Sequence, residues 1–305
     1  MIEIQGLTKE YDGRRVVDDL TFEVRPGLVT GFLGPNGAGK STTMRLALGL
    51  EQPTAGRALV AGRPYAELAD PLRQMGALLD AQALHGGRTA RGHLRWLAAS
   101  NGLPERRVDE VLGQVGLTDA AGRRIRRFSL GMRQRLGVAA ALLGDPAVLL
   151  LDEPVNGLDP EGIRWIRTLL RELAAEGRSV LVSSHLMSEM ALTADHLVVI
   201  GRGRLLADSP TAEFIDQHGR TRIRVRAVDP GKLAALFGGG DHGFTAVQVD
   251  GGAWEVTGAE PERIAALAAA HGVVLYEIAV QQDSLEEAFM RMTADSVEYR
   301  AEVAA

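Results

Sequence analysis

The chain of 305 residues is long enough to bury a sizeable core and favours two domains, because single cores stop growing at roughly 250 to 300 residues. It has no cysteine, which excludes disulfides and thiolate metal sites, and its apolar runs fall far short of the ~20 residues that span a bilayer, so a membrane role requires a membrane partner. The net charge of −5 lies in residues 219–305, whereas residues 1–218 carry 26 basic and 26 acidic side chains, a balance that disfavours nucleic acid as a partner.

The first 27 residues alternate in polarity as paired antiparallel strands do, with a turn at Asp12-Gly13. Their start, Met1-Ile2-Glu3-Ile4, lacks the charged and apolar segments of a signal peptide. Tyr11 lies just before the turn. An exposed aromatic ring at this place can stack on a purine, and packing within the strand is the alternative interpretation.

A phosphate-binding loop follows the apolar stretch Leu28 to Leu33, and a helix is expected from Thr42 onward. Its residues are Gly34, Pro35, Asn36, Gly37, Ala38, Gly39, Lys40, Ser41 and Thr42. Glycines let the backbone turn sharply and direct N–H groups at phosphate oxygens. Lys40 is one of only three lysines among 34 basic residues, and a compact ammonium suits the β and γ phosphates. Ser41 is expected to hold Mg²⁺.

A mostly helical insert is predicted over residues 81–143. It follows a short buried strand, Met75 to Leu79, that ends at Asp80. One helix runs from an N-cap at Thr89 towards Ser100, and a second starts at Pro104.

The third helix of the insert begins at Ser129, directly after an arginine-rich segment. The serine hydroxyl, the free N–H groups and the helix dipole form an anion site, although a structural N-cap without a ligand explains the same residues. The arginines of this segment are interpreted as a solvated helix face rather than a nucleic-acid patch.

Two carboxylates, Asp152 and Glu153, end the apolar stretch Ala147 to Leu151, which predicts a strand buried on both faces. Ligands of open parallel sheets bind at the carboxyl ends of strands. Asp152 is placed to orient Mg²⁺. Glu153 points in another direction, where it can act as general base on the attacking water.

A turn at residues 156–160 precedes the next helix, which Pro160 opens and which ends near Glu176. Ser179 to Ser183 predicts another buried strand. His185 follows it directly, so the imidazole can contact a γ-phosphate from the strand beside the carboxylates, while a structural or solvated histidine is the plainer interpretation.

A domain boundary is expected between residues 208 and 220. Beyond it, residues 223–236 resemble residues 254–267 at an offset of 31 positions, each copy reading as strand, proline-started helix and strand. Two such units in tandem predict a ferredoxin-like domain, with chance similarity of alanine-rich segments as the alternative.

With these motifs in order, residues 1–218 resemble the ATP-binding subunit of an ABC transporter. The resemblance implies roles for each matching residue: Tyr11 stacks on adenine, residues 34–42 form the Walker A loop, Asp152 and Glu153 are the Walker B aspartate and catalytic glutamate, and His185 is the switch histidine. Ser129, Gly131, Met132 and Asp159 belong to the signature and D-loop that serve the ATP of a partner cassette.

The chain departs from the family pattern at two places. Leu130 and Met132 replace a glycine and a glutamine of the signature, and Asp80 replaces the glutamine of the Q-loop. Ser129 retains its hydroxyl, and Asp80 retains an oxygen for Mg²⁺ or water, with Gln82 two residues on.

These features predict an α/β chain: a P-loop NTPase cassette over 1–218, with an antiparallel β subdomain and a helical insert, then a small α+β domain over 219–305. The implied function is an ATPase that uses ATP and Mg²⁺, works as a homodimer or paired cassette, and powers a separately encoded permease at the cytoplasmic face of the membrane. The tail resembles the accessory domain of antibiotic and multidrug exporters, notably at residues 281–289, and thus favours export.

Two alternatives stay open from sequence. One is a soluble ABC ATPase that acts in translation or on DNA, although such proteins usually join two cassettes. The other is an ATP-gated dimerising module with little turnover. No nucleic-acid partner is expected.

Overall fold

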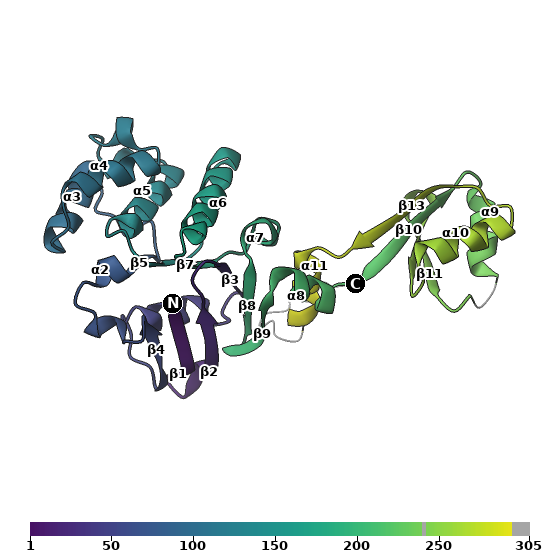
Figure 1. Ribbon diagram of the computed structural model, residues 1–305, viewed down its shortest axis with the longest axis horizontal. Helices are drawn as coiled ribbons and strands as arrows, with labels where there is room; N and C mark the ends of the chain where they lie inside the picture. The colour runs from purple at the N-terminus through teal and green to yellow at the C-terminus, as the bar shows by residue number, and fades with distance from the viewer. Residues whose placement is uncertain (240–241, 295–305) are drawn as a thin grey trace. The chain divides into compact units, whose positions relative to one another are not determined.

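The computed structural model describes residues 1–239 and 242–294. The chain forms two compact units (Figure 1): unit 1 holds Met1–Glu213 and the short stretch from Met292, and unit 2 holds Phe214–Arg291. The division falls within helix α8 (Thr211–His218), inside the segment where the sequence predicts a boundary. Residues 295–305 of the expected second domain lie outside the described residues.

A six-stranded sheet forms the centre of unit 1. The strands are β3 (Val29–Leu33), β5 (Met75–Leu78), β6 (Val148–Leu151), β7 (Ser179–Ser183), β8 (His196–Gly201) and β9 (Arg204–Pro210). Their order is β5-β6-β7-β3-β8-β9, with only β9 antiparallel to its neighbour. Every residue of β3, β6 and β7 is buried, as parallel strands covered on both faces require. The predicted apolar strands are therefore adjacent, and their carboxyl ends share one edge.

A second, antiparallel sheet of unit 1 has the order β2-β1-β4. Its strands are β1 (Ile2–Tyr11), β2 (Arg14–Val24) and β4 (Ala55–Val60), and the expected turn at residues 12–13 joins the first two. Helix α1 (Lys40–Ala47) contacts β2 and β4. Ile2, Phe32 and Met44 meet in one buried core. The antiparallel β subdomain is thus present, and it packs on the helix that follows the phosphate loop.

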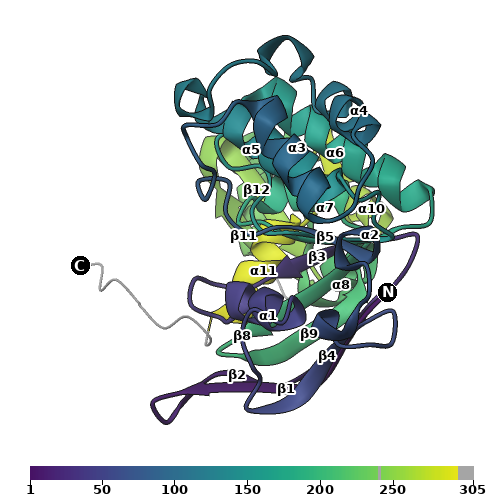
Figure 2. The same cartoon turned by 90° about the vertical axis from the view of Figure 1, so that its left-hand side faces the viewer.

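The helical insert of unit 1 lies away from the antiparallel sheet (Figure 2). It contains α3 (Ala90–Ser100), α4 (Arg106–Gln114) and α5 (Leu130–Leu142), preceded by the short α2 (Pro71–Gln74). The predicted N-cap is confirmed: Thr89 Oγ1 accepts the Gly92 N–H at 3.0 Å. The second helix begins at Arg106, with Glu105 as its N-cap, and not at Pro104 as expected.

Two further helices flank the central strands of unit 1. They are α6 (Pro160–Ala175), which connects β6 to β7, and α7 (Met187–Thr193), which connects β7 to β8. Pro160 occupies the first turn of α6, as predicted, because proline fixes a helical φ and needs no N–H partner there.

Unit 2 has the element order strand, helix, strand, strand, helix, strand. The elements are β10 (Thr221–Ala227), α9 (Pro230–Gly238), β11 (Thr245–Val249), β12 (Ala253–Thr257), α10 (Pro261–Ala270) and β13 (Leu275–Gln282), and α11 (Leu285–Thr293) follows. The sheet order is β11-β12-β10-β13, with antiparallel neighbours. Its core contains Val225, Trp254 and Ile264.

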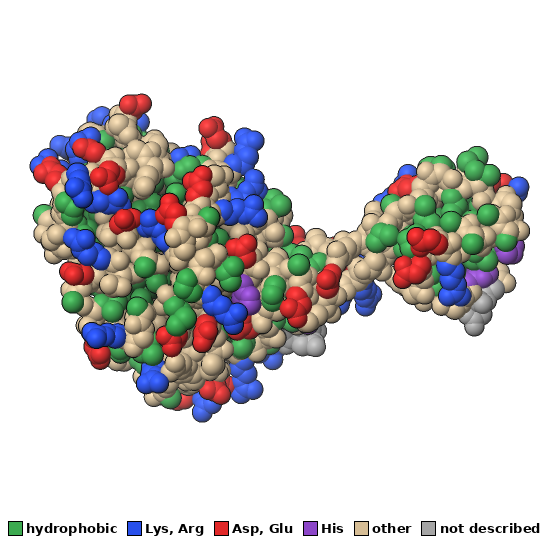
Figure 3. All heavy atoms as spheres, in the orientation of Figure 1, with side chains coloured by type: hydrophobic (Ala, Val, Ile, Leu, Met, Phe, Trp, Pro, Cys, Tyr) green, Lys and Arg blue, Asp and Glu red, His purple; other side chains and the backbone are tan. Residues whose placement is uncertain are grey.

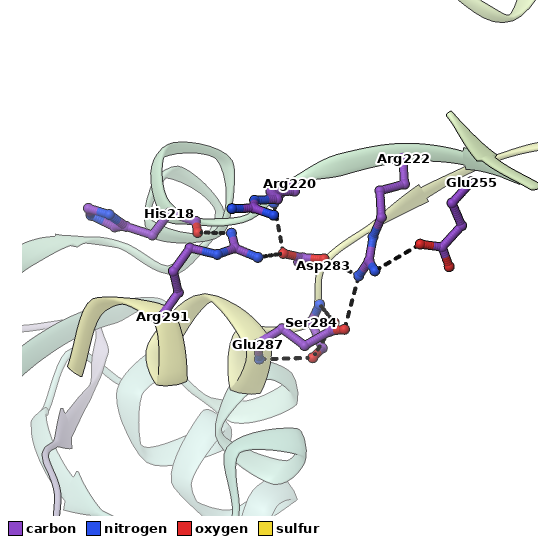
Figure 4. A network of polar contacts seen from close by, with 8 residues as sticks. All are labelled: His218, Arg220, Arg222, Glu255, Asp283, Ser284, Glu287 and Arg291. Carbon is purple, nitrogen blue, oxygen red and sulfur yellow. Dashed lines mark hydrogen bonds and ion pairs between the residues drawn. The ribbon is translucent and has the colours of Figure 1, made fainter. Parts of the chain in front are cut away.

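A network of charged side chains joins β10, the end of β13 and α11 within unit 2 (Figure 4). Asp283, whose side chain is fully buried, accepts from the Arg222 guanidinium at 2.5 Å, from the Arg220 N–H at 2.9 Å and from Arg291. Arg222 also contacts Glu287 at 3.0 Å. Burial alone raises the pKa of Asp283, but the hydrogen bonds from Arg291, Arg220 and Arg222 outweigh it and lower the pKa. Asp283 therefore stays ionised as the centre of this network.

Replacing Asp283 by alanine is expected to destabilise unit 2 by about 3 kcal/mol, because two guanidinium groups lose a buried carboxylate. Urea unfolding of the full chain measures this, with Trp254 left as the only tryptophan after Trp96→Phe and Trp165→Phe. Because the pKa of Asp283 is lowered on folding, its contribution is present above the ordinary carboxyl range near pH 4 and is lost as the pH falls through the lower folded pKa. The exposed Asp250→Ala is the control. Equal midpoints for the two variants at neutral pH would contradict the prediction.

Acidic and basic side chains are interspersed over the face of unit 1 that Figure 3 shows. Across the residues the structure describes, no helix combines the length and the apolar character needed to span a bilayer.

Candidate nucleotide site

The phosphate loop connects β3 to α1, and two of its glycines are required by their surroundings. Gly39 has φ of 104°, a left-handed conformation that side chains disfavour, and a Cβ there would lie 2.6 Å from the Val16 carbonyl oxygen. A Cβ at Gly34 would lie 2.6 Å from the Ile200 carbonyl oxygen. Both contacts are with backbone, which cannot move aside cheaply. The glycine pattern is thus enforced by the fold.

Helix α1 begins at Lys40, not at Thr42 as expected, so Lys40 and Ser41 form its first turn. Its N-cap is Gly39, which offers no side-chain cap, and the first N–H groups of the helix remain available to an anion. A pocket opens at this helix end. It is lined by Val16, Asn36, Gly37, Ala38, Gly39, Lys40, Ser41, Thr42, Asp152 and Glu153.

Lys40 lies half-buried across the loop. Its ammonium donates to the Gly34 carbonyl at 2.5 Å and to the Pro35 carbonyl at 3.2 Å. Burial lowers the pKa of Lys40, and the nearby Glu153 and Asp152 oppose this shift. An anionic ligand in the pocket would also favour the charged form, so the loop is electrostatically suited to phosphate.

Asp152 follows β6, and its carboxylate accepts hydrogen bonds from two serines. Its Oδ2 accepts from Ser41 Oγ at 2.8 Å, and its Oδ1 accepts from Ser183 Oγ at 2.5 Å. Ser41 and Asp152 therefore present oxygen atoms side by side at the start of α1. Such oxygens are the ligands that Mg²⁺ prefers, and it typically takes one or two carboxylates together with phosphates and waters. Among the described residues, no group of three or more acidic or histidine side chains forms a metal cage.

Glu153 and His185 form a contact pair at the same edge of the sheet. His185 Nδ1 lies 2.7 Å from Glu153 Oε2, and the His185 N–H donates to the same oxygen at 3.3 Å. The His185 side chain is 57% exposed and that of Glu153 is 24% exposed. A carboxylate of this kind, close to the phosphate loop and open to water, can accept a proton from a water molecule.

The signature and D-loop residues cap two helices within this chain. Ser129 Oγ accepts the Met132 N–H at 3.2 Å and caps α5, and Asp159 Oδ1 accepts the Gly162 N–H at 2.8 Å and caps α6. A Cβ at Gly131 would lie 2.9 Å from the Gly157 carbonyl oxygen. The two segments are thus in contact. Ser129 forms the N-cap hydrogen bond, and the roles of Ser129 and Asp159 toward the ATP of a partner cassette stay predictions.

Tyr11 and Asp80 lie apart from the phosphate contacts. Tyr11 is 40% exposed; its hydroxyl donates to Glu51, and the Lys9 ammonium lies 4.9 Å from the ring centre. This hydrogen bond raises the pKa of Tyr11. Asp80 is exposed beyond β5, where its Oδ1 accepts the Gln82 N–H at 2.7 Å. The stacking role of Tyr11 and the metal role of Asp80 stay predictions.

Two further contacts at the site were not predicted from the sequence. Ser183 Oγ accepts the Glu153 N–H at 2.9 Å, and Gln134 Nε2 donates to the Glu153 carbonyl at 3.1 Å. The strand pairing Leu151↔Val182 explains the first contact, because it sets Ser183 beside Asp152. The sequence does contain a signal for this contact: Ser183 ends β7, the strand that pairs with β6 and its carboxylates.

A phosphate loop between β3 and α1, with two carboxylates ending β6 beside it, defines a P-loop nucleotide-binding cassette. The family model for ABC transporters matches residues 17–156, and a domain of unknown function matches residues 221–286. The chain is 37% identical over 302 residues to the uncharacterized ABC transporter ATP-binding protein YhcH of Bacillus subtilis, covering 98% of this chain and 97% of that protein.

Two further comparisons indicate the same family. The bacitracin transport ATP-binding protein BcrA of Bacillus licheniformis is 38% identical over 240 residues, 78% of each chain. A solved structure of an ATP binding subunit of an ABC transporter matches with a TM-score of 0.66 and 29% identity, covering 71% of this chain and 92% of that one. The chain belongs to the ATP-binding proteins of ABC transporters. As such a subunit, it hydrolyses ATP to drive transport through a membrane permease.

Proposed function

We propose that this chain is the ATP-hydrolysing motor of an exporter that moves an antibiotic, a drug or a similar small molecule through a separately encoded permease. The observation that carries the proposal is the edge of the central sheet where the Lys40 loop, Asp152 and the Glu153–His185 pair meet. The similarity to a bacitracin transport protein supports the substrate class. The subunit acts at the cytoplasmic face of the membrane, held there by the permease.

The nucleotide is ATP, with its phosphates on the N–H groups of residues 34–42 and on Lys40. Mg²⁺ fits the oxygen pair of Ser41 and Asp152, and Asp80 supplies a further oxygen to the ion or to its water. The ion, when bound, screens the phosphate charge. Tyr11 stacks on adenine. The Lys9 ammonium, which lies over the Tyr11 ring, moves away first, because the ammonium and the adenine compete for the same aromatic ring.

Glu153 is the general base of the reaction. Its carboxylate takes the proton of the attacking water as the oxygen of that water bonds to the γ-phosphorus and the bond to the β-phosphate oxygen breaks. His185 holds the carboxylate in place through its 2.7 Å contact and faces the γ-phosphate.

Two copies of the cassette bind ATP between them. Each nucleotide lies between the phosphate loop of one subunit and Ser129, Gly131, Met132 and Asp159 of the other. One feature of the single chain supports this arrangement. The hydroxyl of Ser129 is at the exposed N-terminus of α5, where the helix dipole favours an anion.

Residues 219–305 constitute an accessory domain of the ferredoxin-like type, and residues 1–218 the cassette with its insert at 81–143. The order β11-β12-β10-β13 and the element sequence of unit 2 support the assignment. No nucleic acid takes part in this function.

The test of export uses inverted membrane vesicles that contain the chain and the membrane protein that co-purifies with it from its native host. We expect ATP-dependent accumulation of one member of an antibiotic panel that includes bacitracin. Vesicles with the permease alone are the control. Accumulation that does not depend on ATP or on this chain would contradict the proposal.

A further inference from the structure

The backbone of Glu153 has a conformation that side chains rarely adopt. Its φ is +50°, in the left-handed region, which costs free energy for a residue with a Cβ. Such a conformation persists only where the surroundings hold it. At this position it decides where the carboxylate of Glu153 points, so the groups that hold it bear on the reaction.

Two buried side chains hold the backbone of Glu153, whose carbonyl also accepts the Asn156 N–H at 3.2 Å. Ser183 Oγ accepts its N–H at 2.9 Å, and Gln134 Nε2 donates to its carbonyl at 3.1 Å. Ser183 is 0% exposed and Gln134 is 4% exposed. Because neither can exchange its contact for water without moving, both hydrogen bonds are strongly directional restraints.

The hydroxyl of Ser183 can point in one direction only. Asp152 Oδ1 accepts from the Ser183 hydroxyl, and the Glu153 N–H donates and does not accept. The Ser183 proton therefore lies towards Asp152 Oδ1, at 2.5 Å, and its lone pair receives the Glu153 N–H. A single side chain thus contacts both the Asp152 carboxylate and the backbone of Glu153, and Asp152 Oδ2 accepts from Ser41.

Gln134 links the carbonyl of the same residue, Glu153, to another part of the cassette. It lies in the second turn of α5, whose N-cap is Ser129. A displacement of α5 along its axis would pull on the carbonyl of Glu153 through Gln134. A hydrogen bond therefore links α5, which presents Ser129 at its N-terminus, to Glu153, the base that activates water.

We infer that Ser183 and Gln134 are positioning residues for ATP hydrolysis, because together they hold the Glu153 backbone in the left-handed conformation that directs its carboxylate to the attacking water. The inference rests on the proposed role of Glu153 as general base. Neither residue lines the phosphate pocket, so we expect the binding of ATP not to depend on them.

The test compares Ser183→Ala with Ser179→Ala in the full chain together with its permease. Ser179 lies at the other end of β7, is 1% exposed, and has a hydroxyl without a hydrogen-bond partner among the described residues, which makes it a matched control. We expect Ser183→Ala to lower kcat roughly 10-fold to 100-fold, as small misplacements of catalytic groups do, and to leave KM for ATP within about twofold.

Two further variants separate positioning from general loss of structure. Ser183→Thr keeps the hydroxyl and is expected to recover most of kcat. Gln134→Leu removes the donor and is expected to lower kcat as well. Combined with Ser183→Ala, it should cost less than the product of the two separate losses, because either change releases the backbone of the same residue, Glu153.

The outcomes distinguish this inference from the proposed function. Turnover of Ser183→Ala equal to that of Ser179→Ala, or a loss that appears wholly as a raised KM, overturns the inference. If Glu153→Gln hydrolyses ATP like the wild type, the general base is misassigned and the proposed function fails first. Loss of activity in Glu153→Gln, with full activity in Ser183→Ala and Gln134→Leu, rejects the positioning role alone.

Discussion

Replacing Glu153 by glutamine is expected to lower ATP turnover at least about 100-fold, the usual contribution of a general base. Glutamine keeps the shape of the side chain and can still contact His185, which lies 2.7 Å from Glu153 Oε2, but it cannot accept a proton from water. The phosphate loop is untouched, so the affinity for ATP should stay within about threefold of the wild type. Phosphate release measures turnover, and calorimetry measures binding.

The same variant reports on the dimer. If hydrolysis resets the closed state, Glu153→Gln should accumulate as an ATP-bound dimer that light scattering detects, whereas the wild type returns to its resting form. Glu172→Gln, an exposed glutamate on α6, serves as the control. Wild-type turnover in Glu153→Gln would remove the general-base assignment.

Replacing Lys40 by alanine is expected to weaken ATP binding about 100-fold, which corresponds to about 2.8 kcal/mol. The ammonium donates to the Gly34 and Pro35 carbonyls and is the cation that lines the phosphate pocket. Without the ammonium, only backbone N–H groups compensate the negative charge of the β and γ phosphates. AMP, which lacks both phosphates, should bind the variant and the wild type with similar affinity.

The lysine content of the chain offers controls for this experiment. Lys232→Ala changes an exposed lysine of unit 2 and should leave ATP affinity unchanged. Lys40→Arg keeps the charge but not the compact shape, so it should restore little of the binding. Normal ATP affinity in Lys40→Ala would contradict the assignment of residues 34–42 as the phosphate site.

Most of the fold of unit 1 could be predicted from short-range sequence patterns. The glycine spacing around Lys40, the apolar stretch before Asp152 and the N-cap at Thr89 each depend on neighbours in sequence, and the structure contains the corresponding loop, strand and helix. The start of α1 was misplaced by two residues, because glycine-rich segments give no clear signal for the first helical turn.

The details of the site depend on contacts between distant residues. The hydrogen bond from Ser183 to Asp152 spans 31 positions, and that from Gln134 to Glu153 spans 19. Both follow from strand register and from the packing of α5, which a single sequence does not specify. The left-handed φ of Glu153 is equally invisible in sequence, since glutamate shows no preference for that conformation.

ATP turnover by the purified chain, alone and with the permease that co-purifies from its native host, tests the central claim most directly. We expect turnover to rise when the permease is added and to disappear in Glu153→Gln. Turnover that is the same with and without the permease, or the absence of any membrane protein from the pull-down, would contradict the assignment of this chain as the motor of a transporter.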